Sequence, residues 1–368
     1  MSRVRSPLPS TTTAPPPSVV PCDVERTAPA VVHLRPSGPR EAHPTPGEGS
    51  EALLEALSAP DTRVVTVETD GPDPLLATAR EPGAAGAVHT HLARALARRR
   101  SAGRAPFTVL SCDPPPRNGP RLRSAVLEAA HRDDPGLAAW IEEHGRFPSS
   151  VLDPVLAAAG SPRWTVEDTF CDERPPLEEV GARFVAGTAP HETLRMRLYD
   201  ATRCLAALLS AGSTARTTDE ALADPAARAA LEGFLAEAAA GFLEVPGVDL
   251  ARYRADVVAR LADPRTGEPL EPLRAAAADA FPALVLPSLR QAVDQDHPRS
   301  WLVLALAAWL RASAGADLDA RTLLRRHHEV LGTLADEPHL ATELEVALAL
   351  LGPAADAPRP TTTPEELP

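Results

Sequence analysis

The 368-residue chain contains no lysine, so all 37 of its basic residues are arginine, and it contains a single asparagine, Asn118. Without lysine, the protein has no Schiff-base chemistry, no lysine general base and no phosphate-binding loop of the Walker type. Aromatic residues make up only 4% of the chain. Alanine, leucine and valine must therefore fill most of its hydrophobic core.

Signals for membranes, nucleic acids and metals are also scarce. The longest apolar run, WLVLALAAWL at 301–310, is about half the length that crosses a bilayer, and the N-terminus has no apolar signal core. The net charge is −13, and the only basic run is Arg98–Arg100, so nucleic acid is not an expected partner. The four cysteines show no metal-ligand spacing. We expect a soluble, cytoplasmic protein with reduced thiols, no metal site and no membrane partner.

The chain divides into two folded parts between proline-rich ends. Residues 1–28 and 352–368 cannot bury enough apolar surface to offset their ordering entropy, which predicts disordered tails. Residues 29–187 form the first folded part, in which strand-like runs alternate with helical periods. The expected strands are 30–34, 63–69 and 106–112, and the expected helices are 87–100, 121–132 and 135–144. This alternation predicts a parallel sheet with right-handed crossovers.

Strand signals stop after Pro190, and residues 188–351 form the second folded part. Apolar residues recur there at helical spacing. The expected helices are 190–211, 225–243, 249–262, 299–313, 317–332 and 337–350. The predicted fold class is therefore an α/β domain followed by an all-helical domain.

The first predicted strand runs into RPSGPREAH, residues 35–43. A dinucleotide site here would need glycines that let the backbone approach the pyrophosphate, followed by a helix N-terminus. Only Gly38 is present, while Ser37 stands where a glycine would help, and prolines interrupt any helix. The stretch is either an ordinary loop or a degenerate phosphate-binding loop.

Three further polar residues lie close to the ends of predicted elements. Asp113 and Asn118 follow the strand at 106–112, where open α/β sheets place ligands, but a proline-stiffened turn closed by Asn118-Gly119 is an equal reading. Asp153 precedes a proline, a position typical of a turn or cap as well as of a ligand.

The stretch HETLRMRLYDATRC, residues 191–204, carries the most charge on one helical face. Arg195, Asp200 and Arg203 fall within one arc of about 140°. Asp200 and Arg203 have the i, i+3 spacing of an ordinary surface ion pair. Without further context, a solvated face is the favoured interpretation, with His191 a structural residue.

Together these segments resemble the long-chain polyol dehydrogenases, a family that includes mannitol 2-dehydrogenase, fructuronate reductase and tagaturonate reductase. The resemblance is strongest over 92–119, 137–153 and 166–198 and extends from about residue 30 to 311. It implies a Rossmann-like NAD-binding domain, shortened here, and a helical domain that completes the active site. It also implies hydride transfer between NAD and a polyol or keto-sugar.

The resemblance assigns functional positions that differ in this chain. The family's GxGxFHRAH appears as RPSGPREAH, which leaves Ser37, Gly38 and His43 as degenerate cofactor-binding positions. The catalytic lysine, asparagine and histidine of the family match Arg195, Asp200 and Arg203. Further site positions of the family keep their polar residues here, at Asp113, Asn118 and Asp153.

Arginine cannot act as the base, because its guanidinium stays protonated. Arg195 or Arg203 could instead pair with Asp200 and fill the old site with a salt bridge. We therefore expect weak or lost activity, weakened NAD binding, and a sugar acid or polyol as the possible ligand. Two alternatives stay open: an active oxidoreductase that uses His191, Asp113 or Asp153 as its base, or a non-catalytic partner of an active paralogue.

Overall fold

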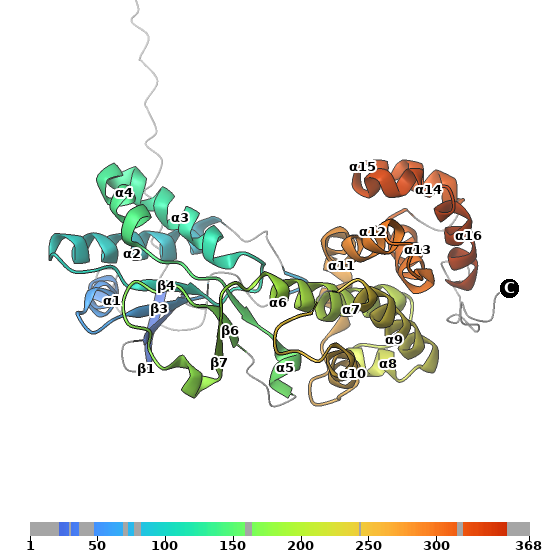
Figure 1. Cartoon of the computed structure of the whole chain (residues 1–368), viewed down its shortest axis with the longest axis horizontal. Helices are drawn as coiled ribbons and strands as arrows, with labels where there is room; N and C mark the ends of the chain where they lie inside the picture. The colour runs from blue at the N-terminus through green and yellow to red at the C-terminus, as the bar shows by residue number, and fades with distance from the viewer. Residues whose placement is uncertain are drawn as a thin grey trace, which may run out of the picture.

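The computed structural model describes residues 22–28, 31–36, 48–68, 73–76, 82–158, 164–242, 244–314 and 319–351. Figure 1 shows an α/β region joined to a helical region, with the chain passing from one to the other at α6 (Ala189–Leu194). A Rossmann-like domain with parallel strands is thus followed by a mostly helical domain, as the sequence predicts. Among the described residues after α6, the only strand-type pairing is an isolated bridge between Thr217 and Pro269.

The first sheet has the strand order β1-β2-β3-β4. Its strands are β1 (Cys22–Ala28), β2 (Val31–Pro36), β3 (Val64–Val67) and β4 (Thr108–Ser111). Strands β2, β3 and β4 are parallel, which confirms the sequence prediction, and β1 is antiparallel to β2. The predicted disordered tail 1–28 is wrong over β1, because a backbone ladder with β2 offsets the ordering cost that side-chain composition alone suggested.

Helices pack against this sheet and bury its two central strands. They are α1 (Glu48–Ser58), α2 (Pro82–Ser101), α3 (Asn118–Asp133) and α4 (Pro135–His144). Every residue of β3 and of β4 is buried, as expected for parallel strands that are covered on both faces. Leu57, Leu92 and Ile141 are fully buried in the shared core. The predicted helix 135–144 matches α4, whereas α1 was not predicted.

A second sheet contains β5 (Ser150–Leu152), β6 (Trp164–Glu167) and β7 (Ala182–Val185), with α5 (Pro154–Ala158) and η1 (Leu177–Val180) beside it. Strand β5 is antiparallel to β6, and β6 is parallel to β7. The prediction of a single parallel sheet is therefore wrong for this segment. The connection from β5 to β6 is too short for the crossover that a parallel pair needs.

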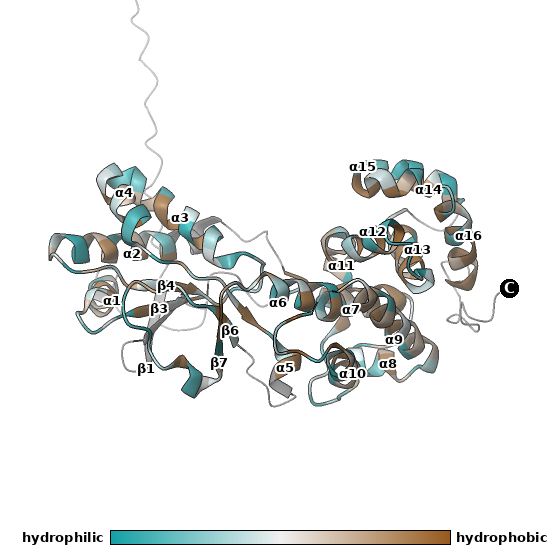
Figure 2. Ribbon diagram, viewed as in Figure 1, coloured by the Kyte–Doolittle hydropathy of each residue, from teal (hydrophilic) through white to brown (hydrophobic). Residues whose placement is uncertain are grey.

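The helical region surrounds α7, which packs against α9, α11 and α13. Its elements are η2 (Arg195–Asp200), α7 (Ala201–Leu209), α8 (Thr218–Leu222), α9 (Pro225–Ala240), α10 (Leu250–Leu261), α11 (Leu270–Leu284), α12 (Leu286–Asp294), α13 (Ser300–Ala314), α14 (Ala320–Arg326), α15 (His328–Leu331), η3 (Gly332–Asp336) and α16 (Leu340–Leu351). Figure 2 shows much of α9 and α16 in brown, the colour of apolar residues. Helices α11 and α12 were not predicted, because Pro282 and Pro287 interrupt the pattern there.

Two segments of the α/β region insert into the hydrophobic core of the helical region. One is the short segment Asp73–Leu76, which follows β3, and the other is α5, which follows β5. Leu75 and Leu76 of the first segment and Val155 and Leu156 of the second are buried in that core. Residues at the carboxyl ends of β3 and β5 are thereby brought against α6, η2 and α7.

Candidate functional site

The helix that carries Arg195 and Asp200 is widened at that point. Helix α6 continues into η2, a π-helical turn over Arg195–Asp200, and then into α7. Because a π-turn joins residues i and i+5, Arg195 and Asp200 lie one turn apart on the same face. Short π-helical turns inside helices are frequent at functional sites.

Five charged side chains meet at this face, and we call them the ionic cluster: Asp73, Arg195, Asp200, Arg203 and Glu268. Arg195 Nε lies 3.3 Å from Asp200 Oδ2, and Arg203 Nη1 lies 3.0 Å from Asp200 Oδ1. Arg203 Nε also donates to Glu268 Oε2 at 2.8 Å, and its Nη2 donates to Glu268 Oε1. The predicted pairing of Asp200 with the two arginines is therefore observed.

Asp73 joins the cluster from the other region of the molecule. Its Oδ2 accepts a hydrogen bond from Arg203 Nη1 at 2.9 Å and one from Arg195 Nη2 at 3.4 Å. Sequence reasoning missed this residue, because it lies more than 100 positions from both arginines and no motif marks it. Glu268 was missed for the same reason.

The ionic cluster is buried, so the predicted surface ion pair of Asp200 and Arg203 is wrong in its exposure. Asp200 is 0% exposed, Arg203 3% and Arg195 8%, because Asp73–Leu76 and α11 cover the face. Burial raises the pKa of Asp200, although the two arginines act in the opposite direction. Burial also opposes the charge of Arg203, but Glu268 and Asp200 outweigh it and hold the pKa of Arg203 well above its usual value.

Asp153 lies at the end of β5, beside the ionic cluster. The carbonyl oxygen of the preceding Leu152 accepts a hydrogen bond from Arg195 at 3.0 Å. Asp153 Oδ1 accepts from the backbone nitrogen of Val155 at 2.9 Å, so the predicted cap role is confirmed at the start of α5. Its Oδ2 accepts from the hydroxyl of Tyr253 at 2.8 Å, and burial raises the pKa of Asp153. Tyr253, on α10, had no sequence signal.

Asn118 and Asp113 lie together at the other end of β5. The Asn118 amide donates to the carbonyl oxygens of Asp113 and Ser150, each at 2.8 Å, and its Oδ1 accepts from the Ser150 nitrogen at 3.0 Å. Asn118 therefore connects the end of β4 to the start of β5. The predicted Asn118-Gly119 turn is wrong, because both residues begin α3. Gly119 is needed there, since a Cβ would lie 2.3 Å from the Phe147 carbonyl oxygen.

His191, on α6, is 2% exposed. Neither of its ring nitrogens makes a hydrogen bond of normal geometry to the described part of the chain. Burial lowers the pKa of His191, and the nearby Arg183 lowers it further. The ring is therefore neutral at physiological pH, the state in which an imidazole can accept a proton.

The remaining candidate residues are not placed. Ser37, Gly38 and His43 lie outside the described residues, so their predicted cofactor role stays a prediction. Over the residues that the structure does describe, no group of three or more His, Cys, Asp and Glu side chains is arranged to hold a metal ion. No helix within those same ranges is long and apolar enough to cross a membrane. Cys112, Cys171 and Cys204 are free thiols.

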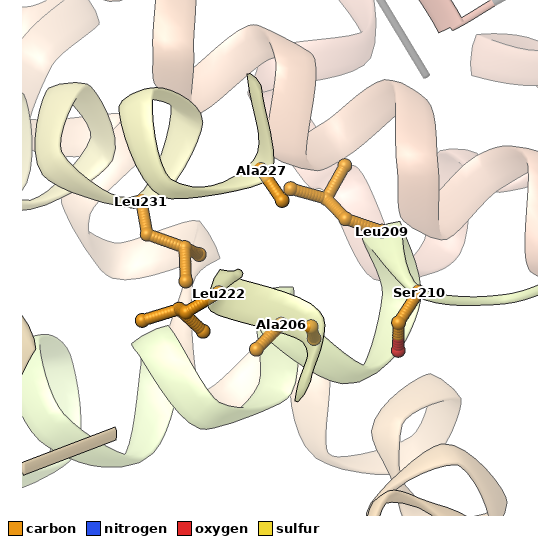
Figure 3. Close-up of a pocket in the computed structure, with 7 residues that line it drawn as sticks. Ala206, Leu209, Ser210, Leu222, Ala227 and Leu231 are labelled. Carbon is orange, nitrogen blue, oxygen red and sulfur yellow. The ribbon is translucent and has the colours of Figure 1, made fainter. Parts of the chain in front are cut away.

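A small pocket lies between α7, α8 and α9 (Figure 3). It is lined by Ala206, Leu209, Ser210, Ala221, Leu222, Ala227 and Leu231, and its volume is about 10 Å³. That is room for about one water molecule. The pocket cannot admit a sugar, so the ionic cluster and its surroundings are the candidate site.

A domain with parallel strands and a helical domain that meet at a charged helix define the class of two-domain dehydrogenases. Residues 40–177 match the model of the mannitol dehydrogenase Rossmann domain, and residues 188–347 match that of the mannitol dehydrogenase C-terminal domain. The chain belongs to the mannitol dehydrogenase family, as its sequence segments indicated. The family consists of NAD-dependent polyol and sugar-acid dehydrogenases.

Curated relatives carry oxidoreductase names. An uncharacterized oxidoreductase, YeiQ, of Escherichia coli K12 is 29% identical over 74% of this chain and 65% of its own length. D-mannonate oxidoreductase of the same strain is 28% identical over 73% and 64%. Mannitol 2-dehydrogenase of Phaeosphaeria nodorum is 26% identical over 81% and 59%. The chain thus spans less than two thirds of the length of these relatives.

Solved structures share the fold. A substrate-free D-sorbitol dehydrogenase matches with a TM-score of 0.65 and 24% identity, over 82% of this chain and 75% of that one. Pseudomonas fluorescens mannitol 2-dehydrogenase, in a complex with NAD and D-mannitol, matches with a TM-score of 0.60 and 23% identity, over 82% and 74%. At these identities the likeness establishes the architecture of this chain.

Proposed function

We propose that this chain is a divergent member of the family in which NAD-dependent hydride transfer is lost or very weak. The family's catalytic lysine, asparagine and histidine correspond, in this proposal, to Arg195, Asp200 and Arg203. The observation that carries it is the closed environment of Arg195. Its guanidinium lies between the carboxylates of Asp73 and Asp200 and the carbonyl of Leu152.

Hydride transfer from an alcohol requires a base that takes the hydroxyl proton. Arg195 stays protonated, and the neighbouring carboxylates stabilise its charge further. A positioned base contributes about 10²–10⁴-fold to rate, equivalent to roughly 3–5 kcal/mol. Asp200 adds a second loss, because an anion stands where negative charge would develop and where a neutral amide would donate hydrogen bonds.

Cofactor binding is weakened in the same proposal. The stretch RPSGPREAH offers one glycine, Gly38, to a pyrophosphate that family members bind over several. Ser37 and His43 are the other residues that would face the cofactor. We derive no catalytic step through NAD in this chain. We place the protein in the cytoplasm, in keeping with its free thiols.

The test is turnover and binding by the purified full-length chain. Absorbance of NADH is followed with D-mannitol, D-fructose and D-fructuronate, and NAD and NADH are titrated by calorimetry. We expect no sustained turnover and dissociation constants in the millimolar range or weaker. Steady NADH-linked turnover that disappears in Arg195→Met would contradict the proposal.

A second function is supported by His191. This neutral, buried imidazole has two ring nitrogens without regular hydrogen bonds, so it is chemically able to serve as a replacement base. Asp153 is less suited, because its carboxylate is already bound by Tyr253 and the start of α5. If His191 serves as the base, His191→Ala abolishes turnover while His191→Gln in its place does not restore it. A third role, as a partner of an active paralogue, would appear as co-purification from the native host.

A further inference from the structure

We propose that Asp73 is an internal ligand that occupies a binding site for a small-molecule carboxylate. The site consists of the guanidinium groups of Arg195 and Arg203, and an external hydroxy acid displaces the Asp73 carboxylate from it. This inference rests on the proposed function only in placing the site on the family's former catalytic face. It adds a ligand class and a competing element of the chain itself.

The contacts of Asp73 are those that a bound carboxylate would make. One oxygen, Oδ2, bridges Arg203 Nη1 at 2.9 Å and Arg195 Nη2 at 3.4 Å. The other oxygen accepts a hydrogen bond from the backbone nitrogen of Leu76. Charge-assisted hydrogen bonds from two guanidinium groups are a strong and geometrically specific means of binding a carboxylate. Nothing in these contacts depends on the carboxylate belonging to the chain.

The charge balance of the ionic cluster makes such an exchange feasible. Asp200 and Glu268 already supply two negative charges to Arg195 and Arg203. Asp73 adds a third, so its departure leaves two cations and two anions, a balanced set. An entering carboxylate then restores the present charge count. Exchange therefore does not leave a buried charge without a partner, which is the costly event for an ion cluster.

The exposure of the cluster indicates the side from which a ligand would enter. The Asp200 side chain is 0% exposed and that of Arg203 only 4%, whereas the Asp73 side chain is 15% exposed and that of Glu268 26%. Asp73 thus lies between the arginines and solvent. Its removal opens a path to both guanidinium groups without any change in α6 or α7.

The segment that carries Asp73 is held in a strained conformation. Leu75 and Leu76 have φ angles of 51° and 69°, the left-handed region that is unfavourable for residues with a Cβ. Two consecutive leucines adopt it because their side chains are buried in the helical core, at 4% and 8% exposure. This strain opposes the docking of Asp73 and reduces the advantage that an attached carboxylate has over a free one.

The ligand class follows from the groups around the two arginines. A carboxylate replaces Asp73, and hydroxyl groups beside it can donate to the oxygens of Glu268 and Asp200. An open-chain hydroxy acid fits this pattern, whereas a neutral polyol lacks the group that competes with Asp73. D-gluconate is therefore the probe, and D-mannitol is the neutral control of the same chain length.

The experiment compares calorimetric titrations of D-gluconate into the wild-type chain, Asp73→Asn and Asp263→Asn. The last variant disrupts an arginine–carboxylate pair outside the cluster, between Asp263 and Arg265 at 2.7 Å. Vacating the site raises the fraction of competent protein, so gluconate should bind Asp73→Asn at least about tenfold more tightly than the wild type. Asp263→Asn should match the wild type, and D-mannitol should not distinguish the three. Equal or weaker gluconate binding by Asp73→Asn, or an equal gain for mannitol, overturns the proposal.

Hydrogen exchange in the wild-type chain gives a readout that does not depend on a variant folding. The Leu76 amide donates to Asp73, so saturating gluconate should speed its exchange about threefold or more while α7 amides become more protected. Bound gluconate with unchanged exchange at Leu76 contradicts displacement. Neither measurement uses NAD or turnover. Hydride transfer by this chain would therefore refute the proposed function and leave this inference standing, and the reverse also holds.

Discussion

The two ends of strand β5 are held by polar centres of opposite kind. At Ser150, the uncharged side chain of Asn118 makes three hydrogen bonds to backbone groups. At Leu152, the strand ends against Arg195 and the ionic cluster. Both centres are buried, and both join segments that are distant in sequence. The first lies within the α/β region, and the second joins that region to the helical one.

The difference lies in what each centre loses when one member is removed. A neutral amide leaves behind unpaired backbone groups, whose desolvation costs a modest amount for each group. A buried ion leaves behind a charge in a medium that solvates it poorly. The ionic cluster should therefore respond more strongly to substitution than the Asn118 centre, although the Asn118 centre has the shorter and more regular hydrogen bonds.

The largest effect is expected for Asp200→Ala. The change leaves Arg195 and Arg203 without the fully buried carboxylate that pairs with both, so the free energy of unfolding should fall by about 3–5 kcal/mol. Urea unfolding followed by circular dichroism measures it. Asp263→Ala, at an exposed pair, is the control and should change little. A loss below about 1 kcal/mol for Asp200→Ala would mean that the cluster is not held by its charges.

Asn118→Ala tests the neutral centre. Three hydrogen bonds disappear and the Ser150 backbone groups lose a buried partner, so the unfolding free energy should fall by about 3 kcal/mol. Urea unfolding is again the measurement. Ser124→Ala, on an exposed turn of the same helix, is the control. A loss greater than that of Asp200→Ala would reverse the comparison between the two centres.

Tyr253→Phe removes a single neutral donor from a buried carboxylate, and so lies between the two kinds of centre. The hydroxyl of Tyr253 donates to Asp153 at 2.8 Å. Hydrogen bonds to charged groups contribute about 1.5–3 kcal/mol, and we expect a loss of about 2 kcal/mol at pH 7. Thermal unfolding of the variant and the wild type at matched pH measures it.

The loss in Tyr253→Phe should depend on pH in a stated direction. Burial raises the pKa of Asp153 in the fold, and the tyrosine hydroxyl works against that rise. The variant therefore has a still higher folded pKa. A group with a raised pKa stabilises the fold at low pH, and that contribution is lost as pH rises through the folded pKa. The deficit of the variant should thus be smaller at pH 4 than at pH 7, and a constant deficit would contradict this.

Glu237→Gln is expected to have the smallest effect and concerns a carboxylate with only backbone donors. Glu237 accepts hydrogen bonds from the nitrogens of Trp301 and Leu302, each at 2.9 Å, and burial raises its pKa to about 7. Its contribution is therefore full below the ordinary value near 4.5 and is lost as pH rises toward 7. Glutamine cannot ionise and avoids that loss.

Relative to the wild type, Glu237→Gln should gain on the order of 1 kcal/mol between pH 5 and pH 8, a value discounted because the carboxylate is partly solvated. Melting temperatures at the two pH values measure it. Glu232→Gln, one turn away on the exposed face of α9, is the control. A difference between variant and wild type that does not change with pH would show that Glu237 keeps an ordinary pKa.

Several features could be predicted from local pattern. The helical period of 135–144 corresponds to α4, and the apolar runs around Val64–Val67 and Thr108–Ser111 are parallel strands. These predictions succeed because the pattern of burial repeats within a few residues of the same element. The antiparallel strand β5 and strand β1 were missed, because pairing partner and direction are not encoded in one strand's own pattern.

Residue types along the chain determined which family this protein belongs to, where its helices run, and that no lysine base is available at Arg195. Tertiary structure alone decided that Asp73 and Glu268 enclose the two arginines, that Asn118 connects strands rather than closing a turn, and that Asp200 lies away from water. The reason is physical. Helix and strand periods reflect neighbours a few residues apart, whereas the state of a buried charge depends on whichever distant segments the fold brings within about 4 Å of it.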